Sequence, residues 1–174
     1  MSVHNSSEFL WREVPFSENP IDIFNNVYEY WNKMRGDRFA PAWTDLDLLD
    51  LGPKLIPHIC VVNIPEDNPP FPYRFFGTFL TELLNYEMSG KTTAMLKPEK
   101  FRTFCEDQYC FIIESRYPTI FAGSITTENG VVREHFTLRL PLSDDGQRVT
   151  NIIAIEKYDV ESPELREYYR SFGE

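Results

Sequence analysis

The sequence lacks long apolar runs, an apolar N-terminal signal segment and paired cysteines. None of its apolar runs approaches the ~18–20 residues that a membrane span requires, and the first residues do not read as a signal peptide. Its three cysteines, Cys60, Cys105 and Cys110, include no C-x-x-C pair and lie in apolar surroundings. An odd number of such thiols is typical of a reducing compartment. The sequence therefore predicts a soluble, cytoplasmic protein.

Basic residues are also in short supply. Lys and Arg number 17 against 27 Asp and Glu, which gives a formal net charge of -10. Nucleic acids and anionic membranes both require clustered Lys and Arg, so neither is expected as a partner. The histidines are His4, His58 and His135, and none has a partner four residues away or a nearby cysteine pair. No metal site is predicted.

The motifs of common catalytic sites are absent as well. There is no glycine-rich phosphate loop and no Gly-x-Ser-x-Gly elbow. A small enzyme on a cone-like α+β fold, of the ketosteroid-isomerase kind, would need a buried carboxylate. Glu134 and Glu156 are the acids within apolar strands, and both are flanked by charge, so we expect both to be exposed. The sequence accordingly predicts a protein that is not an enzyme.

At 174 residues the chain is long enough for one domain with a substantial core. We divide it into a flexible leader (1–18), an N-terminal helical cap (19–54), a core (55–160) and a short C-terminal helix (161–174). The first helix begins at Asn19-Pro20 and ends before Gly36. Its apolar positions form two adjacent stripes, which indicate packing on the outer face of a sheet or a homodimer contact through Phe24, Tyr28 and Trp31.

The remaining segments alternate between strand and helix patterns. A β-branched run at 59–64, a proline-rich turn and an aromatic run at 71–76 predict a hairpin. Helices are predicted over 79–86 and 98–116, and apolar alternation with turn residues predicts strands over 119–127, 131–142 and 149–158. This order favours an α+β domain, an antiparallel sheet with helices packed on one face.

Six short motifs occur in a fixed order along this pattern. They are Trp31 with Arg35-Gly36; Pro41 with Asp45 and Asp47; Leu55 with Pro57-His58; Tyr73-Arg74 with Gly77-Thr78; Ser89-Gly90-Lys91; and Pro141-Leu142-Ser143 with Asp145-Gly146. Together they resemble the stand-alone bacterial PAS domains over about residues 20–160. The resemblance implies a five-stranded sheet in the order 2-1-5-4-3 and a cavity between sheet and helices. It implies binding of a ligand or cofactor, or dimerisation, and it does not imply catalysis.

The candidate ligand-binding residues are those expected to face this cavity: Arg74, Phe76, Thr78, Phe104, Tyr109, Phe121, Ser124 and Phe136. Arg74 lies within an otherwise aromatic strand, and an inward guanidinium needs a partner, so a small hydrophobic acid is the expected ligand. The alternatives are that the aromatic side chains fill the core and that Arg74 lies on the outer face beside Asp22 or Glu29. A slip of one residue in strand parity would exchange the two faces.

A second group is expected to be structural. Trp31, Arg35, Arg38, Asp45 and Asp47 are predicted to pin the first helix and the loop after it to the domain. Thr44 with Asp47 resembles a capping box at the start of a short helix ending at Leu51.

The resident cofactor stays unknown. The helix over 98–116 has no histidine for haem, and the stretch from Phe79 to Gly90 has no cysteine for flavin photochemistry. The first hypothesis for function is a cytosolic sensory or regulatory module that binds a small ligand or a signalling protein, with no attached effector domain. The alternative is an interaction or dimerisation module whose core is filled.

Overall fold

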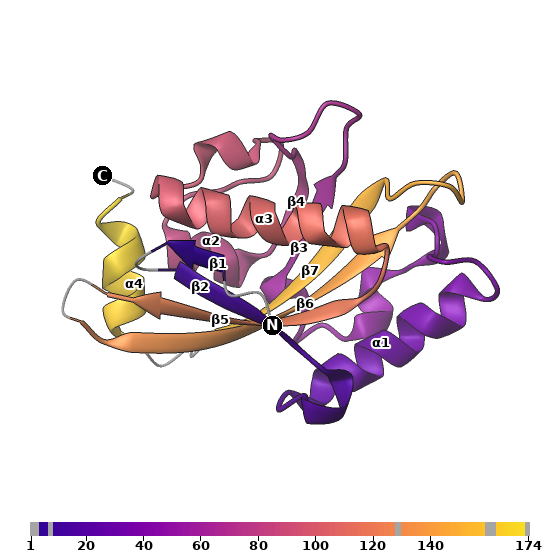
Figure 1. The fold of residues 1–174 in the computed structure, drawn as a ribbon, viewed down its shortest axis with the longest axis horizontal. Helices are drawn as coiled ribbons and strands as arrows, with labels where there is room; N and C mark the ends of the chain where they lie inside the picture. The colour runs from indigo at the N-terminus through magenta and orange to yellow at the C-terminus, as the bar shows by residue number, and fades with distance from the viewer. Residues whose placement is uncertain (1–3, 7–8, 128–129, 159–162, 173–174) are drawn as a thin grey trace.

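The computed structural model describes residues 4–6, 9–127, 130–158 and 163–172. Within them the chain forms one antiparallel sheet and four α-helices (Figure 1). The strands are β1 (His4–Ser6), β2 (Phe9–Val14), β3 (Ile59–Asn63), β4 (Tyr73–Phe76), β5 (Thr119–Thr126), β6 (Val132–Leu142) and β7 (Asn151–Tyr158). The helices are α1 (Asp22–Arg35), α2 (Thr78–Leu84), α3 (Glu99–Ser115) and α4 (Pro163–Arg170).

The strand order across the sheet is β1-β2-β5-β6-β7-β3-β4. The five strands expected from the sequence are neighbours in the order β4-β3-β7-β6-β5, and two further strands extend this sheet beyond β5. The predicted sheet of five strands is therefore too small. β2 lies antiparallel to β5 in continuous register from Phe9 opposite Ile125 to Val14 opposite Ile120.

The assignment of residues 1–18 to a flexible leader is wrong for β2. Its sequence alternates in the two-residue period of a strand, and Phe9 and Trp11 point to one face of the sheet while Val14 belongs to the other. Phe9 packs against the rings of Phe101 and Phe104 of α3. The segment is short and follows polar residues, but it contributes two large aromatic side chains to the core.

Helices cover both faces of the sheet: α2, α3 and α4 share one face, and the extra N-terminal helix lies on the other, which is one of the two alternatives that its sequence left open. The view in Figure 1 shows α1 on one side of the sheet and α2 and α3 on the other. We call the side under α1 the outer face and the side under α2, α3 and α4 the inner face. Each face carries its own cluster of buried side chains, so the central strands are buried on both sides.

The broad apolar stripe of α1 is explained by packing on the outer face. Phe24, Val27 and Trp31 are buried against the sheet, and Trp31 Nε1 donates a hydrogen bond of 2.8 Å to the backbone carbonyl of Pro141. Tyr28 is half-buried and its ring lies 4.6 Å from that of Phe16. Phe24 and Trp31 are consequently unavailable for the homodimer contact that the sequence suggested. The intramolecular alternative accounts for the stripe.

Among the described residues, no helix is long and apolar enough to cross a membrane. All three cysteines are free thiols, with Cys60 and Cys105 buried and Cys110 half-buried.

Candidate ligand site

Arg74 does not face the cavity. The pairing of β3 with β4 shifts between Val61 and Val62, which leaves Arg74 as the extra, bulged residue between Phe75 and Tyr73. Its guanidinium is exposed and lies 4.9 Å from the centre of the Trp43 ring. The predicted inward orientation is wrong, because the bulge turns Arg74 outward while both Tyr73 and Phe76 reach the inner face. Its contact is an aromatic ring rather than the acids Asp22 or Glu29.

The other predicted cavity residues divide between the two faces. Phe76, Phe104, Tyr109 and Phe121 belong to the buried cluster of the inner face. Phe136 packs with the outer cluster, Thr78 is exposed, and Ser124 is half-buried opposite Leu10. The last three are therefore corrections to the predicted site.

The parity error on β6 has a physical cause. Phe136, Leu138 and Leu140 point to the outer face, which α1 covers, so the apolar side of the strand is not the cavity side. The cavity side carries His135, Thr137 and Arg139, all buried. Since both faces are covered by helices, hydrophobic alternation alone does not indicate which one holds the cavity.

Arg139 is the residue that the predicted site missed. It is only 1% exposed although it carries a full positive charge in the middle of the sheet. Its Nε donates a 2.8 Å hydrogen bond to Oε1 of Gln108 on α3, and its guanidinium carbon lies 4.3 Å from the centre of the Tyr109 ring. The signal in the sequence is a lone arginine between leucines in a strand that is covered on both sides.

Glu156 on β7 supplies the opposite charge. Its Oε1 lies 3.5 Å from Nη2 of Arg139, and its other oxygen accepts a short hydrogen bond from the hydroxyl of Thr137. It is 6% exposed, so the expectation that Glu156 is solvent-exposed is wrong, whereas Glu134 is exposed as expected. Burial raises the pKa of the Glu156 carboxyl, and Arg139 and Thr137 oppose that increase.

Two donors of this cluster have no acceptor. Among the buried side-chain atoms, Nη1 of Arg139 and Nε2 of Gln108 lack a hydrogen-bond partner. They belong to two side chains that are already hydrogen-bonded to each other. A buried unpaired donor costs about 1–3 kcal/mol, and more when it is charged, so each of these two donors lowers the stability of the fold as described.

A cavity of about 20 Å³ lies beside this cluster on the inner face. Its walls include three leucines of α2, Leu80, Leu83 and Leu84, and the ring of Phe101 on α3. Tyr109 and Glu156, which also contact Arg139, line it as well. That volume is enough for about one water molecule. The space expected between sheet and helices is thus almost completely filled by Leu, Phe and Tyr side chains.

The other polar groups at the cavity are neutral. The hydroxyls of Tyr73 and Tyr109 are 3.4 Å apart, and Sγ of Cys60 lies 3.8 Å from the Tyr109 hydroxyl. Burial raises the pKa of the Cys60 thiol to about 12, so it is held as the thiol and not as the nucleophilic thiolate.

His135 is the first of the three buried polar residues on the inner face of β6, before Thr137 and Arg139. Its ring stacks on Tyr158 at 4.5 Å, and its Cε1 occupies the space that a Cβ at Gly123 would need, 2.4 Å from that position. Burial, with a smaller contribution from Arg139, lowers the pKa of His135 to about 3. The imidazole is therefore neutral at physiological pH. No group of three or more His, Cys, Asp or Glu within the described ranges is arranged to hold a metal ion.

The predicted structural cluster is brought together only in part. Arg38 pairs with Asp45 at 2.8 Å, and Arg35 lies 5.7 Å from the centre of the Trp31 ring. The carboxylate of Asp47 instead accepts from the backbone amide of Leu49. The predicted helix from Thr44 is replaced by two 3₁₀ turns, Trp43–Asp45 and Leu48–Leu51, so the proposed Thr44 capping box is wrong.

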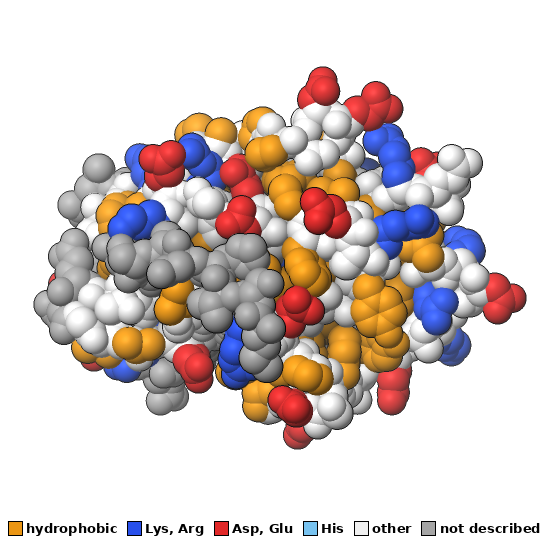
Figure 2. Space-filling model, in the orientation of Figure 1, with side chains coloured by type: hydrophobic (Ala, Val, Ile, Leu, Met, Phe, Trp, Pro, Cys, Tyr) orange, Lys and Arg blue, Asp and Glu red, His pale blue; other side chains and the backbone are white. Residues whose placement is uncertain are grey.

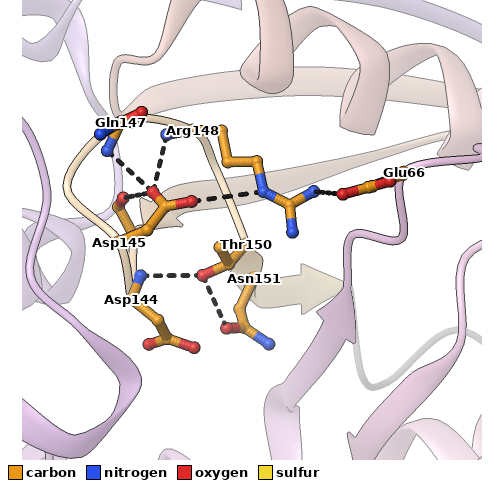
Figure 3. A network of polar contacts seen from close by, with 8 residues as sticks. Glu66, Asp144, Asp145, Gln147, Arg148, Thr150 and Asn151 are labelled. Carbon is orange, nitrogen blue, oxygen red and sulfur yellow. Dashed lines mark hydrogen bonds and ion pairs between the residues drawn. The ribbon is translucent and has the colours of Figure 1, made fainter.

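The Pro-Leu-Ser-x-Asp-Gly motif has a structural role in the loop between β6 and β7. One oxygen of Asp145 accepts from the backbone amides of Gln147 and Arg148 at 2.8 and 2.9 Å, and Arg148 reaches across to Glu66 (Figure 3). These bonds lower the pKa of Asp145 to about 2. The carboxylate holds the turn rather than presenting itself to a ligand.

The surface differs from the interior in its charge arrangement. On the face shown in Figure 2, acidic and basic side chains are interspersed with hydrophobic ones. Arg139 and Glu156 are buried beneath this surface. The buried cluster, rather than a surface patch, is therefore the candidate site.

A family model described as a PAS domain matches residues 23–155, which is more than half of the chain. The chain belongs to the PAS domain family. A search of curated proteins finds no significant match.

Solved structures similar to this PAS domain include three light-oxygen-voltage (LOV) proteins. The dark structure of the photoreceptor Aureochrome1 LOV shares 14% identity over 74% of this chain and 90% of its own, with a TM-score of 0.45. A fungal LOV domain photoreceptor shares 15% identity over 79% of this chain and 92% of its own, with a TM-score of 0.41. An RNA-binding LOV receptor shares 14% identity over 95% of this chain and 42% of its own, with a TM-score of 0.44. At these identities the similarities say nothing of a cofactor or partner for this chain.

Proposed function

We propose that this PAS domain is a non-enzymatic sensory or regulatory module that receives its signal by binding a small ligand on the inner face of the sheet. The observation that supports it is the buried pair of Arg139 and Glu156 beside the small cavity. A buried ion pair costs desolvation, and well-packed apolar residues in its place are often as stable or more so. We infer that the pair is kept for recognition rather than for stability.

The proposed signal path follows from what touches the site. Gln108 and Tyr109 lie on α3 and contact Arg139, whereas the leucines on the opposite wall lie on α2. A ligand larger than one water molecule must push these two helices and the sheet apart. Because α2 is a single short helix of seven residues, Thr78–Leu84, it is the wall that we expect to move.

Native mass spectrometry of the purified full chain tests this proposal. We expect a fraction of the protein to carry an extra mass that disappears on denaturation. In Leu83→Phe, which adds volume at a side chain that is 2% exposed, the retained mass should fall at least threefold. Glu82→Gln, a change at an exposed position of the same helix, is the control and should retain the ligand.

A second candidate, an interaction module with a filled core, is favoured by the small volume of the cavity. It predicts no retained mass, together with a dimer or a complex with a signalling protein in the same spectrum. A spectrum with no retained mass, and a crystal structure with the inner face packed as described here, would reject the ligand-binding proposal in favour of this one.

A further inference from the structure

The wall of the small cavity carries a single charged side chain. Among the described residues that line it, Glu156 is the only acid, and no Lys, Arg or His accompanies it. The other ionisable groups of the wall are tyrosines and cysteines. Burial raises the pKa of each of them, so they are uncharged at neutral pH: Tyr73, Tyr109, Tyr158, Cys60 and Cys105.

Glu156 belongs to the cavity and to the buried ion pair at the same time. It lines the cavity, and its Oε1 lies 3.5 Å from Nη2 of Arg139. Arg139 itself is not one of the described residues that line the cavity. Its guanidinium is 1% exposed, and a positive charge at that depth needs an anionic partner. Glu156 therefore fills the position beside Arg139 that the carboxylate of an acid ligand would need.

The filled position limits the charge that the cavity accepts. A ligand carboxylate would meet the Glu156 carboxylate within a cavity of about 20 Å³ and would find no cation on its described wall. A ligand cation would find the charge of Glu156 already balanced by Arg139, whose guanidinium carbon lies 4.3 Å from the centre of the Tyr109 ring. Burying either ion without a partner costs more than burying an uncharged group of the same shape.

We propose that Glu156 determines the ligand class of this PAS domain: it occupies the anion position beside Arg139, so the cavity accepts uncharged, largely apolar molecules and rejects carboxylates. The inference rests on the function proposed above and names the ligand class of the same site. The leucines of α2 and the ring of Phe101 on the wall favour an apolar body. This class replaces the hydrophobic acid that was expected when Arg74 was assigned to the cavity.

Three planar probes of nearly the same shape test the charge preference. Benzoate is anionic, benzamide is uncharged and benzamidine is cationic at neutral pH. Each is titrated into the full chain and followed by ligand-observed NMR. We expect benzamide to bind at least about tenfold more tightly than either ion, because the ions lose their hydration without gaining a partner.

Two variants of Leu83 assign the binding to the cavity. Leu83→Ala enlarges the wall, so a probe that is too large for wild type should bind this variant with the same order of affinities. Leu83→Phe fills the wall and should weaken benzamide at least about threefold. Glu82→Gln, at an exposed position of the same helix, should leave all three affinities unchanged.

Substitution of Glu156 should reverse the preference. In Glu156→Ala the space of the carboxylate joins the cavity and Arg139 loses its partner, so benzoate should bind at least about tenfold more tightly than benzamide. Glu156→Gln keeps the shape and removes the charge, and it should lower the ratio of benzamide to benzoate affinity at least about threefold. Glu134→Ala, at an exposed position of β6, is the matched control and should keep the wild-type order.

The stability of Glu156→Ala gives a second readout that a large probe does not limit. Acetate has the shape of the missing carboxylate, and at about ten times its dissociation constant it should raise the melting temperature of this variant by about 3–6 °C. Acetamide, which has the same shape without the charge, and sodium chloride at the same ionic strength should not. Wild type and Glu134→Ala should not respond to acetate. If Glu156→Ala does not fold, the wild-type titrations and Glu156→Gln decide the question.

Three results would overturn the ligand class. They are benzoate or benzamidine binding to wild type as tightly as benzamide, no binding of benzamide to wild type and to Leu83→Ala, and the wild-type order of affinities in the Glu156 variants. If native mass spectrometry still finds a retained mass, the proposed function survives and only the assignment of an uncharged ligand fails. No retained mass, together with the expected order of the probes, would reject the function and leave the charge selection by Glu156 intact.

Discussion

The two faces of the sheet are built from different kinds of side chain. The described buried side chains of the outer face are aliphatic, with Phe24 and Trp31 of α1, except for the amide of Asn151 at the end of β7, and none of them is charged. The inner face has a larger aromatic cluster, and the buried polar groups Gln108, Arg139 and Glu156 lie among it. The same strands supply both faces, so the difference comes from alternate residues of β6 and β7, together with Gln108 of α3. The outer face has the composition of a packed core, whereas the inner face carries groups that packing does not require.

The largest difference in stability effect between the two faces is expected for substitutions at two adjacent residues of β7. Ile155 is buried on the outer face and Glu156 on the inner face. Glu156→Ala should destabilise the protein by about 3–5 kcal/mol, because it leaves Arg139 as a buried charge without a partner. Ile155→Val removes one methylene group and should cost about 0.5–1.5 kcal/mol. Urea unfolding followed by fluorescence measures both.

The cause of the loss in Glu156→Ala is checked by a second substitution. Adding Arg139→Met to that variant removes the unpaired charge and should restore most of the lost stability. If the double variant is as unstable as the single one, the loss is due to a cavity and not to charge.

The inner face should also make stability depend on pH, because it contains the buried, titratable side chain of His135. The native pKa of His135 is about 3, below its unfolded value near 6.5. Its contribution to stability is therefore complete above about pH 6.5 and is lost as the pH falls toward 3, by up to about 1.4 kcal/mol per pH unit. The raised pKa of Glu156 opposes this slope. The free energy of unfolding of wild type minus that of His135→Leu isolates the contribution of the histidine, and this quantity should decrease as the pH falls.

Chemical unfolding at half-unit steps from pH 7.5 to 4 measures that difference. Parallel curves for the two proteins would show that His135 is protonated in the native state or is reached by water. Phe136→Leu, on the outer face of the same strand, provides a control with no titrating group at the changed position.

The smallest effect is expected in the polar cluster of the loop after α1. The pair of Arg38 and Asp45 has the ideal short distance, but the side chains are 47% and 35% exposed. Asp45→Ala should therefore change stability by less than about 1 kcal/mol, although the Ala42 amide and then Arg38 lower the pKa of Asp45. Thermal unfolding in low and high salt measures it. A loss above 2 kcal/mol would mean that the loop is held to the domain as firmly as the sequence first suggested.

Element types were predictable where one periodicity dominates. α1 and α3 follow the helical repeat, and β3, β5 and β7 follow β-branched runs, so their existence follows from local pattern. β2 was missed because six residues beside polar ones give a weak signal, although its two aromatic residues are decisive for packing.

The site was less predictable because it depends on which way a side chain points. Arg74 and Arg139 are both single arginines in apolar strands, and the sequence does not distinguish them. A bulge in the pairing of β3 with β4 turns Arg74 to solvent, whereas regular pairing of β6 with β7 directs Arg139 to the inner face beside Glu156. Register and bulges arise from contacts between distant segments, which a local pattern does not contain.

The attachment of β2 to β5 determines how this domain can be shortened. The family match begins at residue 23, after β2 has ended. A protein trimmed to that boundary would expose the hydrogen-bonding edge of β5, together with the rings of Phe111 and Phe121 that Trp11 now covers. An open, aromatic-lined edge pairs readily with any extended polypeptide, including a second copy of itself. The N-terminal strand thus acts as a built-in guard against aggregation, and the position that it fills is one that a strand from another protein could take in its place.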